Sequence, residues 1–173
     1  MKIFITAIIL VAIIQSNPTL LVIIGFVAIS IYIIRLFINK ARTRKIVLSY
    51  QHLEELINGF DPYEFEEYIA QIFKMSGYNT QLTSKSNDGG YDIIVSSGKS
   101  VSLVEVKKYS LGNKIGREKI QKLHSAVIDY GARTGIFVTT SSFTNAAIEY
   151  ANRNKIELID GSTLISKIRS LNG

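Results

Sequence analysis

The feature that most constrains this chain is an almost wholly apolar run from Leu20 to Ile38. Its 19 residues would extend about 28 Å as an α-helix, close to the roughly 30 Å hydrocarbon core of a bilayer. Arg35 lies one turn from the end of the run, where a long basic side chain can reach the membrane interface. The run therefore predicts a transmembrane helix over residues 20–38.

A shorter apolar run, Ile3–Ile14, comes before it, and residues 15–19 between the two runs have turn composition. The short run has three interpretations: the core of a signal peptide, an interfacial or re-entrant segment, or a short span in a locally thinned bilayer. No small-residue cleavage site follows it. We predict a hairpin of two transmembrane helices, at about 3–16 and 20–38, with a single span as the alternative.

The excess positive charge lies entirely at the start of the chain. The net charge is +6, and residues 1–45 contain no acidic group, whereas the rest of the chain carries equal numbers of acidic and basic groups. The basic residues of the first segment are Lys2, Arg35, Lys40, Arg42, Arg44 and Lys45. By the positive-inside rule this pattern predicts a cell-membrane (inner or plasma membrane) protein whose remaining residues are cytoplasmic.

The sequence has no Cys and only two His residues, His52 and His124. This excludes a disulfide framework, thiolate catalysis and Cys-ligated zinc or iron–sulfur sites. A metal bound by this chain would need oxygen ligands.

Three regions follow from these patterns: a membrane anchor at 1–39, a basic and amphipathic linker helix at 40–59, and a domain at 60–173. Apolar residues at helical spacing, Ile46, Tyr50, Leu53 and Ile57, define the linker helix. A plain spacer is an equally good interpretation of this segment.

The domain opens with Asp61-Pro62-Tyr63-Glu64, which predicts a helix capped by Asp61 and running to about Met75. On the helical wheel, Glu66 or Glu64, but not Glu67, can face a site at the edge of the domain.

Strands and helices then alternate along the chain. The pattern predicts strands at 91–96, 101–109, 135–140 and 156–160, and helices near 120–130, 144–154 and 162–171. A hairpin followed by alternating helices and strands predicts a mixed α/β fold, with a sheet that is partly parallel and flanked by helices.

Charged residues interrupt two of these strands. Asp92 begins the first strand, and Glu105 and Lys107 lie two residues apart on the second, so that both face the same side. The hairpin brings Asp92 beside Glu105. Two carboxylates form a hard-oxygen site suited to Mg²⁺ or Mn²⁺, and a nearby lysine could orient or deprotonate water and stabilise charge on a phosphate. A salt-bridged surface strand is the alternative interpretation of these three residues.

Several further segments match one known family in order. They are Phe65-Glu66, Gly77-Tyr78, Asp88–Asp92, Val104–Tyr109, Ile120-Gln121, Gly135–Ser141 with Phe143-Thr144, Ala147, Ala151 and Leu158–Gly161. Through them, the chain from about Asp61 to Leu164 resembles the Mrr-type restriction endonuclease domain, a branch of the PD-(D/E)xK nuclease superfamily. The resemblance implies a restriction-endonuclease-like fold.

The resemblance also implies roles for single residues. Asp92 and Glu105 would be metal ligands, with Glu66 as a helix-borne carboxylate supporting the metal. Lys107 would be the catalytic lysine, and Gln121 would reach the site from the following helix. Many relatives carry Gln where this chain has Glu105; Glu is the better metal ligand. Asp88 is a rival for the first ligand position.

Basic residues gather after the second strand. We expect Lys108, Lys114, Arg117, Lys119 and Lys122 to contact DNA phosphates, with an ordinary solvated helix face as the alternative.

The sequence thus predicts a membrane-anchored, Mg²⁺- or Mn²⁺-dependent DNA endonuclease, with a role in defence that rests on the resemblance alone. Its membrane partner would be lipid, and cutting both strands would require a homodimer. The alternatives are a catalytically silent nucleic-acid-binding or regulatory module of the same fold and, less favoured, a junction resolvase.

Overall fold

The structure is a computed structural model that describes residues 18–49, 53–83 and 89–171. It divides into two compact units, Met1–Thr43 and Arg44–Gly173. We describe each unit by itself, and refer to the second as the sheet domain.

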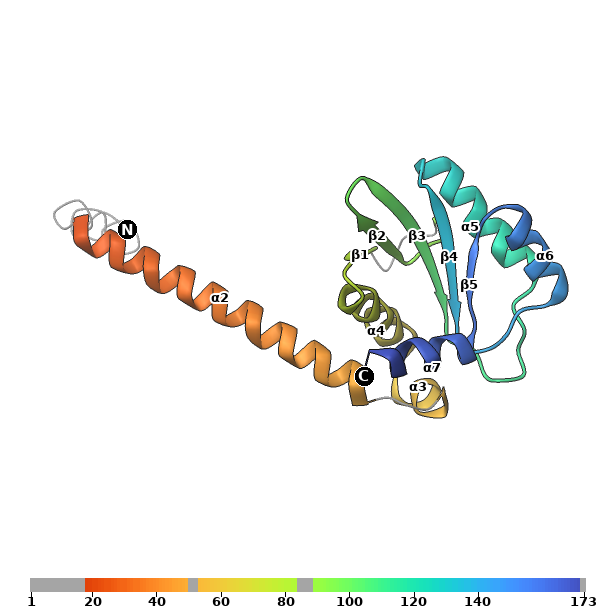
Figure 1. Cartoon of the computed structure of the whole chain (residues 1–173), viewed down its shortest axis with the longest axis horizontal. Coiled ribbons are helices and arrows are strands. Elements are labelled where there is room, and N and C mark those ends of the chain that lie inside the picture. The colour runs from red at the N-terminus through yellow and green to blue at the C-terminus, as the bar shows by residue number, and fades with distance from the viewer. Residues whose placement is uncertain (1–17, 50–52, 84–88, 172–173) are drawn as a thin grey trace, which may run out of the picture. The chain divides into compact units, whose positions relative to one another are not determined.

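Helix α2, Pro18–Ser49, accounts for the described part of the first unit and continues beyond it (Figure 1). It contains the predicted helix at 20–38 and runs through the basic cluster that follows. Between Val22 and Ile38 its large apolar side chains are exposed, Phe26 to 69% and Phe37 to 70%. In the described part of the chain, no helix meets the length and apolarity required to cross a membrane. The predicted first helix, at 3–16, lies outside the described residues.

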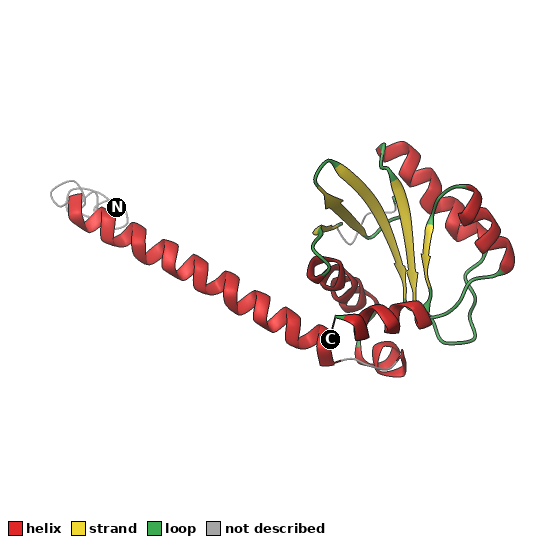
Figure 2. Ribbon diagram, in the orientation of Figure 1, coloured by secondary structure: helices red, strands yellow, loops and turns green. Residues whose placement is uncertain are grey.

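The sheet domain is built on five strands in the order β1-β2-β3-β4-β5, which are labelled in Figure 1 and yellow in Figure 2. Strands β1 (Asn79–Leu82), β2 (Ile93–Ser97) and β3 (Ser100–Lys107) form an antiparallel meander. Strands β4 (Thr134–Thr139) and β5 (Glu157–Ile159) then pair in parallel with β3 and with each other. The predicted mixed α/β sheet is therefore confirmed, with β3 at its centre.

Helices cover both faces of the sheet. On one face, α3 (Leu53–Gly59), α4 (Pro62–Met75) and α7 (Gly161–Ser170) share an apolar core with Val104 and Val106 of β3. On the other face, α5 (Arg117–Tyr130) and α6 (Asn145–Arg153) pack on Leu103 and Phe137. Side chains of alternate residues of β3 thus belong to two separate apolar cores, because successive side chains of a strand point to opposite faces of the sheet.

Helix α4 begins where the sequence predicts. Asp61 caps it, and the reciprocal bonds from Glu64 N to Asp61 Oδ1 and from Asp61 N to Glu64 Oε2 are both 2.8 Å long. These bonds satisfy two backbone donors that a helix start otherwise leaves without partners. Phe65, Tyr68 and Ile69 are buried, so the capped start sets which face of α4 lies on the sheet.

Two predictions differ from the structure. Strand β1 was missed, because the sequence Asn-Thr-Gln-Leu carries little apolar signal and forms a strand only by pairing with β2. The predicted linker helix is divided: Ile46 belongs to α2, Leu53 and Ile57 belong to α3, and Tyr50 and His52 lie outside the described residues.

Candidate active site

Three charged side chains meet where β2 begins and β3 ends. The β2–β3 register pairs Ile93 with Val104, which places Asp92 beside Glu105 as the hairpin predicted. Glu105 and Lys107 share the side of β3 that carries Leu103, which is the side on which α5 packs.

The ammonium group of Lys107 connects the three residues. Its Nζ lies 2.7 Å from Glu105 Oε1 and 3.4 Å from Asp92 Oδ2, and it donates a hydrogen bond of 3.1 Å to the carbonyl oxygen of Val106. The backbone N–H of Val106 donates to Asp92 Oδ2 at 2.7 Å. Asp92 is therefore held from the strand itself as well as by the lysine, and the arrangement is pre-organised.

Burial makes this group electrostatically unusual. Glu105 is only 7% exposed. Burial is the main reason that its pKa is raised, and the nearby negative charge of Asp92 adds to the effect, while Lys107 opposes it. For Lys107, burial lowers the pKa, but Glu105 and Asp92 outweigh burial and leave the pKa above its ordinary value. Lys107 is therefore protonated at neutral pH.

Glu66 approaches the same group from α4. Burial raises the pKa of Glu66 to about 7, and the negative charges of Asp92 and Glu105 contribute to the increase. Its neighbour Glu67 is exposed, while Glu64 is committed to the capping box. Of the three glutamates on this helix, Glu66 is the one coupled to the site.

The donor set fits a hard divalent cation at Asp92 and Glu105. Both carboxylates already converge on one cationic atom, Lys107 Nζ. Mg²⁺ typically uses one or two protein carboxylates and completes its shell with water and phosphate oxygens. Within the described ranges no three His, Asp or Glu side chains form a metal-binding cluster, and the role of Glu66 as a metal ligand stays a prediction.

Two further residues, Gln121 and Asp88, were considered for the site from the sequence. Gln121 is exposed on α5, and it makes no hydrogen bond with Asp92, Glu105 or Lys107 in the part of the chain that is described. Asp88, the rival ligand, lies outside the described residues.

Lys122, which follows Gln121, is the residue on α5 that acts on the site. Its positive charge lowers the pKa of Glu105, against the larger effect of burial. Its side chain packs against Gly90, where an added Cβ would lie 3.0 Å from Lys122 Cγ and where φ is +81°. A residue with a side chain at position 90 would thus be strained and would crowd Lys122. In the sequence, the Gly89-Gly90 pair was the available sign of a close approach at this position. It did not indicate that Lys122 is the residue that approaches.

The predicted DNA-contacting residues divide into two groups. Lys108 has protein partners: its Nζ donates to the carbonyl oxygens of Ile57, at 2.7 Å, and of Phe60, so its contact with DNA stays a prediction. A cation at the C-terminal end of α3 satisfies carbonyls that the helix leaves free. Exposed side chains remain at the other four positions, Lys114, Arg117, Lys119 and Lys122. The guanidinium of Arg117 lies 5.0 Å from the centre of the Tyr150 ring, which holds it at the α5–α6 surface.

Comparison with known proteins agrees with this architecture. The chain matches the Mrr_cat restriction endonuclease family over residues 57–168. It is 30% identical over 120 residues to the type IV methyl-directed restriction enzyme EcoKMrr of Escherichia coli (strain K12), covering 65% of this chain and 39% of that protein. It is 32% identical over 88 residues to the uncharacterized protein y4cE of Sinorhizobium fredii (strain NBRC 101917 / NGR234), covering 49% of this chain and 22% of that protein. The chain thus spans well under half the length of these curated relatives.

Solved structures share the fold. The restriction endonuclease MspJI, in complex with a 27-mer oligonucleotide, superposes with a TM-score of 0.54 at 24% identity, over 68% of this chain and 30% of that one. The DNA modification-dependent restriction endonuclease AspBHI gives 0.53 at 19% identity, over 78% of this chain and 36% of that one. Since the family match covers more than half of the chain and the fold agrees, this chain belongs to the Mrr_cat restriction endonuclease family, whose members are phosphodiester hydrolases.

Proposed function

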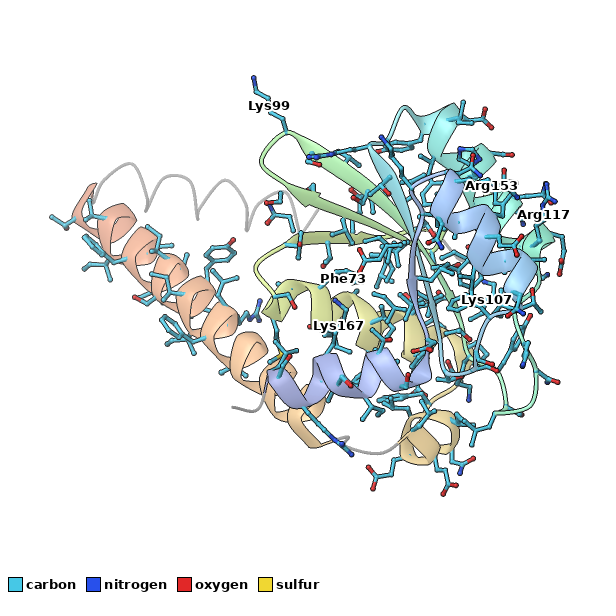
Figure 3. All side chains as sticks on the ribbon, turned by 45° about the vertical axis from the view of Figure 1, so that its right-hand side comes forward. Phe73, Lys99, Lys107, Arg117, Arg153 and Lys167 are labelled. Carbon is cyan, nitrogen blue, oxygen red and sulfur yellow. The ribbon has the colours of Figure 1, made fainter. Side chains whose placement is uncertain are left out.

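We propose that the sheet domain hydrolyses phosphodiester bonds of DNA, with Mg²⁺ or Mn²⁺ held by Asp92 and Glu105. The observation that carries this proposal is the convergence of Asp92, Glu105 and Lys107 at one edge of the sheet. Figure 3 lets the reader follow Lys107 among the side chains of the domain. Membership of a nuclease family supplies independent support.

The residues have distinct roles in this proposal. A divalent cation bound there supplies Lewis-acid chemistry: it polarises the phosphodiester and lowers the pKa of water. Lys107, with its raised pKa, donates hydrogen bonds to phosphate oxygens and stabilises developing negative charge rather than accepting a proton. Glu66, whose pKa is about 7, can hold or release a proton beside the reacting groups near neutral pH.

DNA would lie along the surface that carries Lys114, Arg117, Lys119 and Lys122. These side chains are exposed on α5 and the loop before it, on the face of the sheet to which Glu105 and Lys107 point. They would bind the phosphate backbone, so affinity should fall steeply as salt rises. Methylated DNA is the substrate we favour, because the relative EcoKMrr is named as methyl-directed. A restriction-type role in defence rests on the same relationship.

We also propose that residues 1–39 hold the chain at membrane lipid, with the sheet domain in the cytoplasm. The apolar run at 20–38, the absence of acidic residues from 1–45 and the exposed apolar side chains of α2 support attachment to lipid. A transmembrane hairpin and a helix lying on the bilayer are separate forms of this proposal. Labelling of the N-terminus from outside intact cells would contradict the hairpin, which places that end inside.

The test of the nuclease proposal uses the full chain, purified in detergent, with methylated and unmethylated supercoiled plasmid and with Mg²⁺ or Mn²⁺. We expect nicking that requires the metal and is lost in Asp92→Ala. The matched control is Asp129→Ala, which removes a carboxylate from the exposed surface of α5. DNA binding without cleavage by the wild-type chain would instead support the non-catalytic module. Linear products whose rate rises with the square of enzyme concentration would support action as a homodimer.

A further inference from the structure

A cavity lies on the α4 and α7 side of the sheet, apart from the catalytic group. Its volume is about 690 Å³, within the size range of small-molecule sites. Its apolar lining comes from both helices and from the sheet, and includes Ile72, Phe73, Val95, Ile136, Ile159 and Leu164. The sheet residues among them belong to one of the two apolar cores.

This cavity and the catalytic group lie at opposite ends of β3. Ser100 and Ser102 line the cavity, whereas Glu105 and Lys107 belong to the other end of the strand and to its other face. At about 3.3 Å per residue, Ser102 and Lys107 are roughly 17 Å apart. Figure 3 likewise separates Phe73 and Lys167 from Lys107. A ligand in the cavity would therefore not occupy the catalytic site.

A row of hydroxyl groups crosses the sheet at the cavity. The register pairs Ser97 with Ser100 and Ser102 with Thr134, and all four residues line the cavity. By strand alternation they continue the same face as Val95, Val104 and Ile136, which is apolar elsewhere. The hydroxyls of the three serines make no hydrogen bond to any other described residue, so they remain available as donors.

Positive charge lies beside these hydroxyls. Arg133 lines the cavity, and its guanidinium forms no ion pair with another residue of the described segments. Lys167, also in the lining, lies 3.8 Å from Glu157, and both side chains are about half exposed. An ion pair this exposed contributes little, so Lys167 can turn toward a ligand at small cost. The charged residues of the lining thus sum to one net positive charge.

We propose that this cavity binds a small organic anion, with its apolar body between α4 and α7 and its acidic group on Arg133 and the serine hydroxyls. The apolar lining accounts for the body of the ligand, since burial of apolar surface is the main source of affinity in such sites. The guanidinium and the hydroxyls account for the charge, because a guanidinium binds a carboxylate through two parallel hydrogen bonds. The site is independent of the proposed hydrolysis.

The test uses 4-phenylbutyrate as the anionic probe and 4-phenylbutyramide as its neutral counterpart. Each is titrated calorimetrically into the full chain in detergent, and a detergent blank is subtracted. We expect one saturable site for the acid and binding at least about tenfold weaker for the amide, because a charge-assisted hydrogen bond is lost. Arg133→Gln and Lys167→Gln should weaken binding of the acid, whereas Arg153→Gln, on α6 outside the lining, should not.

Three results would overturn the proposal: no saturable heat with the acid, equal affinity for acid and amide, or unchanged affinity in both Arg133→Gln and Lys167→Gln. Both substituted residues have exposed side chains, and circular dichroism melting of each variant establishes that it is folded. Plasmid nicking measured on the same preparations reports separately on the catalytic group.

Discussion

At the scale of single residues, the candidate site depends on one ammonium group shared among three oxygen atoms. Lys107 Nζ forms ion pairs with Glu105 and Asp92 and donates a hydrogen bond to the carbonyl oxygen of Val106. The N–H of Val106 in turn donates a hydrogen bond to Asp92. Two carboxylates this close repel each other, and the lysine between them offsets that repulsion. The same geometry presents two carboxylates to one cation.

Replacing Lys107 with Met should remove the charge while keeping most of the volume of the side chain. We expect plasmid nicking to fall at least about 100-fold, because a positively charged donor in the transition state is lost. The fold should persist, since Glu105 can take up a proton once its cationic partner is gone. Lys99→Met, at the exposed tip of the β2–β3 hairpin, is the matched control. Wild-type nicking rates in Lys107→Met would contradict the proposed role.

Glu66 provides a prediction about pH. Its pKa is about 7 in the folded chain, against an ordinary value of 4.5, so the folded state binds this proton more tightly than the unfolded state does. The resulting stabilisation is complete below about pH 4.5 and is lost as pH rises through about 7. Glu66→Gln does not bind or release this proton. The urea midpoint of Glu66→Gln minus that of wild type should therefore increase from pH 5 to pH 8.

The urea unfolding curves are measured with EDTA present, so that no bound metal contributes to stability. Glu67→Gln, on the exposed side of α4, is the control for removing a glutamate from this helix. A constant difference between Glu66→Gln and wild type across the range would show that the pKa of Glu66 is not raised.

At the scale of elements, side-chain caps fix the starts of two helices that pack on the sheet. Asp61 and Asp160 cap α4 and α7, and the two helices pack on the same face of the sheet. Gly161, the first residue of α7, has no room for a side chain: an added Cβ would lie 2.5 Å from the carbonyl oxygen of Thr140. The start of α7 is therefore fitted closely against the segment after β4.

The cap at Asp160 gives a stability prediction. Burial by itself would raise the pKa of Asp160, but hydrogen bonds from Thr163 and Ser162 outweigh it and lower the pKa. Asp160→Ala should lower the free energy of unfolding by about 1 kcal/mol at pH 7, because the cap is lost. Asp160→Asn should lose much less, since Asn also caps helices. Because the pKa of Asp160 is lowered from its ordinary value of 3.8, the charged carboxylate stabilises the fold at pH values above 3.8. This stabilisation is lost as the pH falls below that value. Equal stability of Asp160→Ala and wild type in chemical denaturation would refute the cap.

At the scale of the whole molecule, the chain combines two units of opposite surface character. The described helix of the first unit exposes mainly apolar side chains, whereas the second unit buries its apolar residues in two cores separated by the sheet. Exposed apolar surface of this extent marks a site of interaction with lipid or protein. The absence of acidic residues from 1–45 is compatible with the membrane attachment proposed above.

Removal of residues 1–43 tests that assignment. We expect the full chain to float with vesicles of phosphatidylethanolamine and phosphatidylglycerol in a density gradient, and the shortened chain to stay at the bottom. Replacing Lys40 and Arg42 with Gln in the full chain should weaken flotation only slightly, because most of the affinity comes from apolar contact. Flotation of the shortened chain would place the lipid-binding surface in the sheet domain instead.

Much of the architecture could be read from local patterns. The order of strands and helices, the cap at Asp61 and the adjacency of Asp92 and Glu105 each depend on neighbours in sequence or on one hairpin. Such features follow from helical and strand periodicity and from turn chemistry, which act over a few residues.

Other features depend on contacts between distant segments, and only the tertiary structure decided them. Lys108 donates to carbonyl oxygens at the end of α3, 48 and 51 positions earlier in the chain, and the charge of Lys122 lowers the pKa of Glu105. Strand β1 exists because β2 offers it a partner. A basic side chain binds whichever oxygen atoms the packing of helices on the sheet brings within reach, and that packing is set by the whole apolar core rather than by the residues on either side of it.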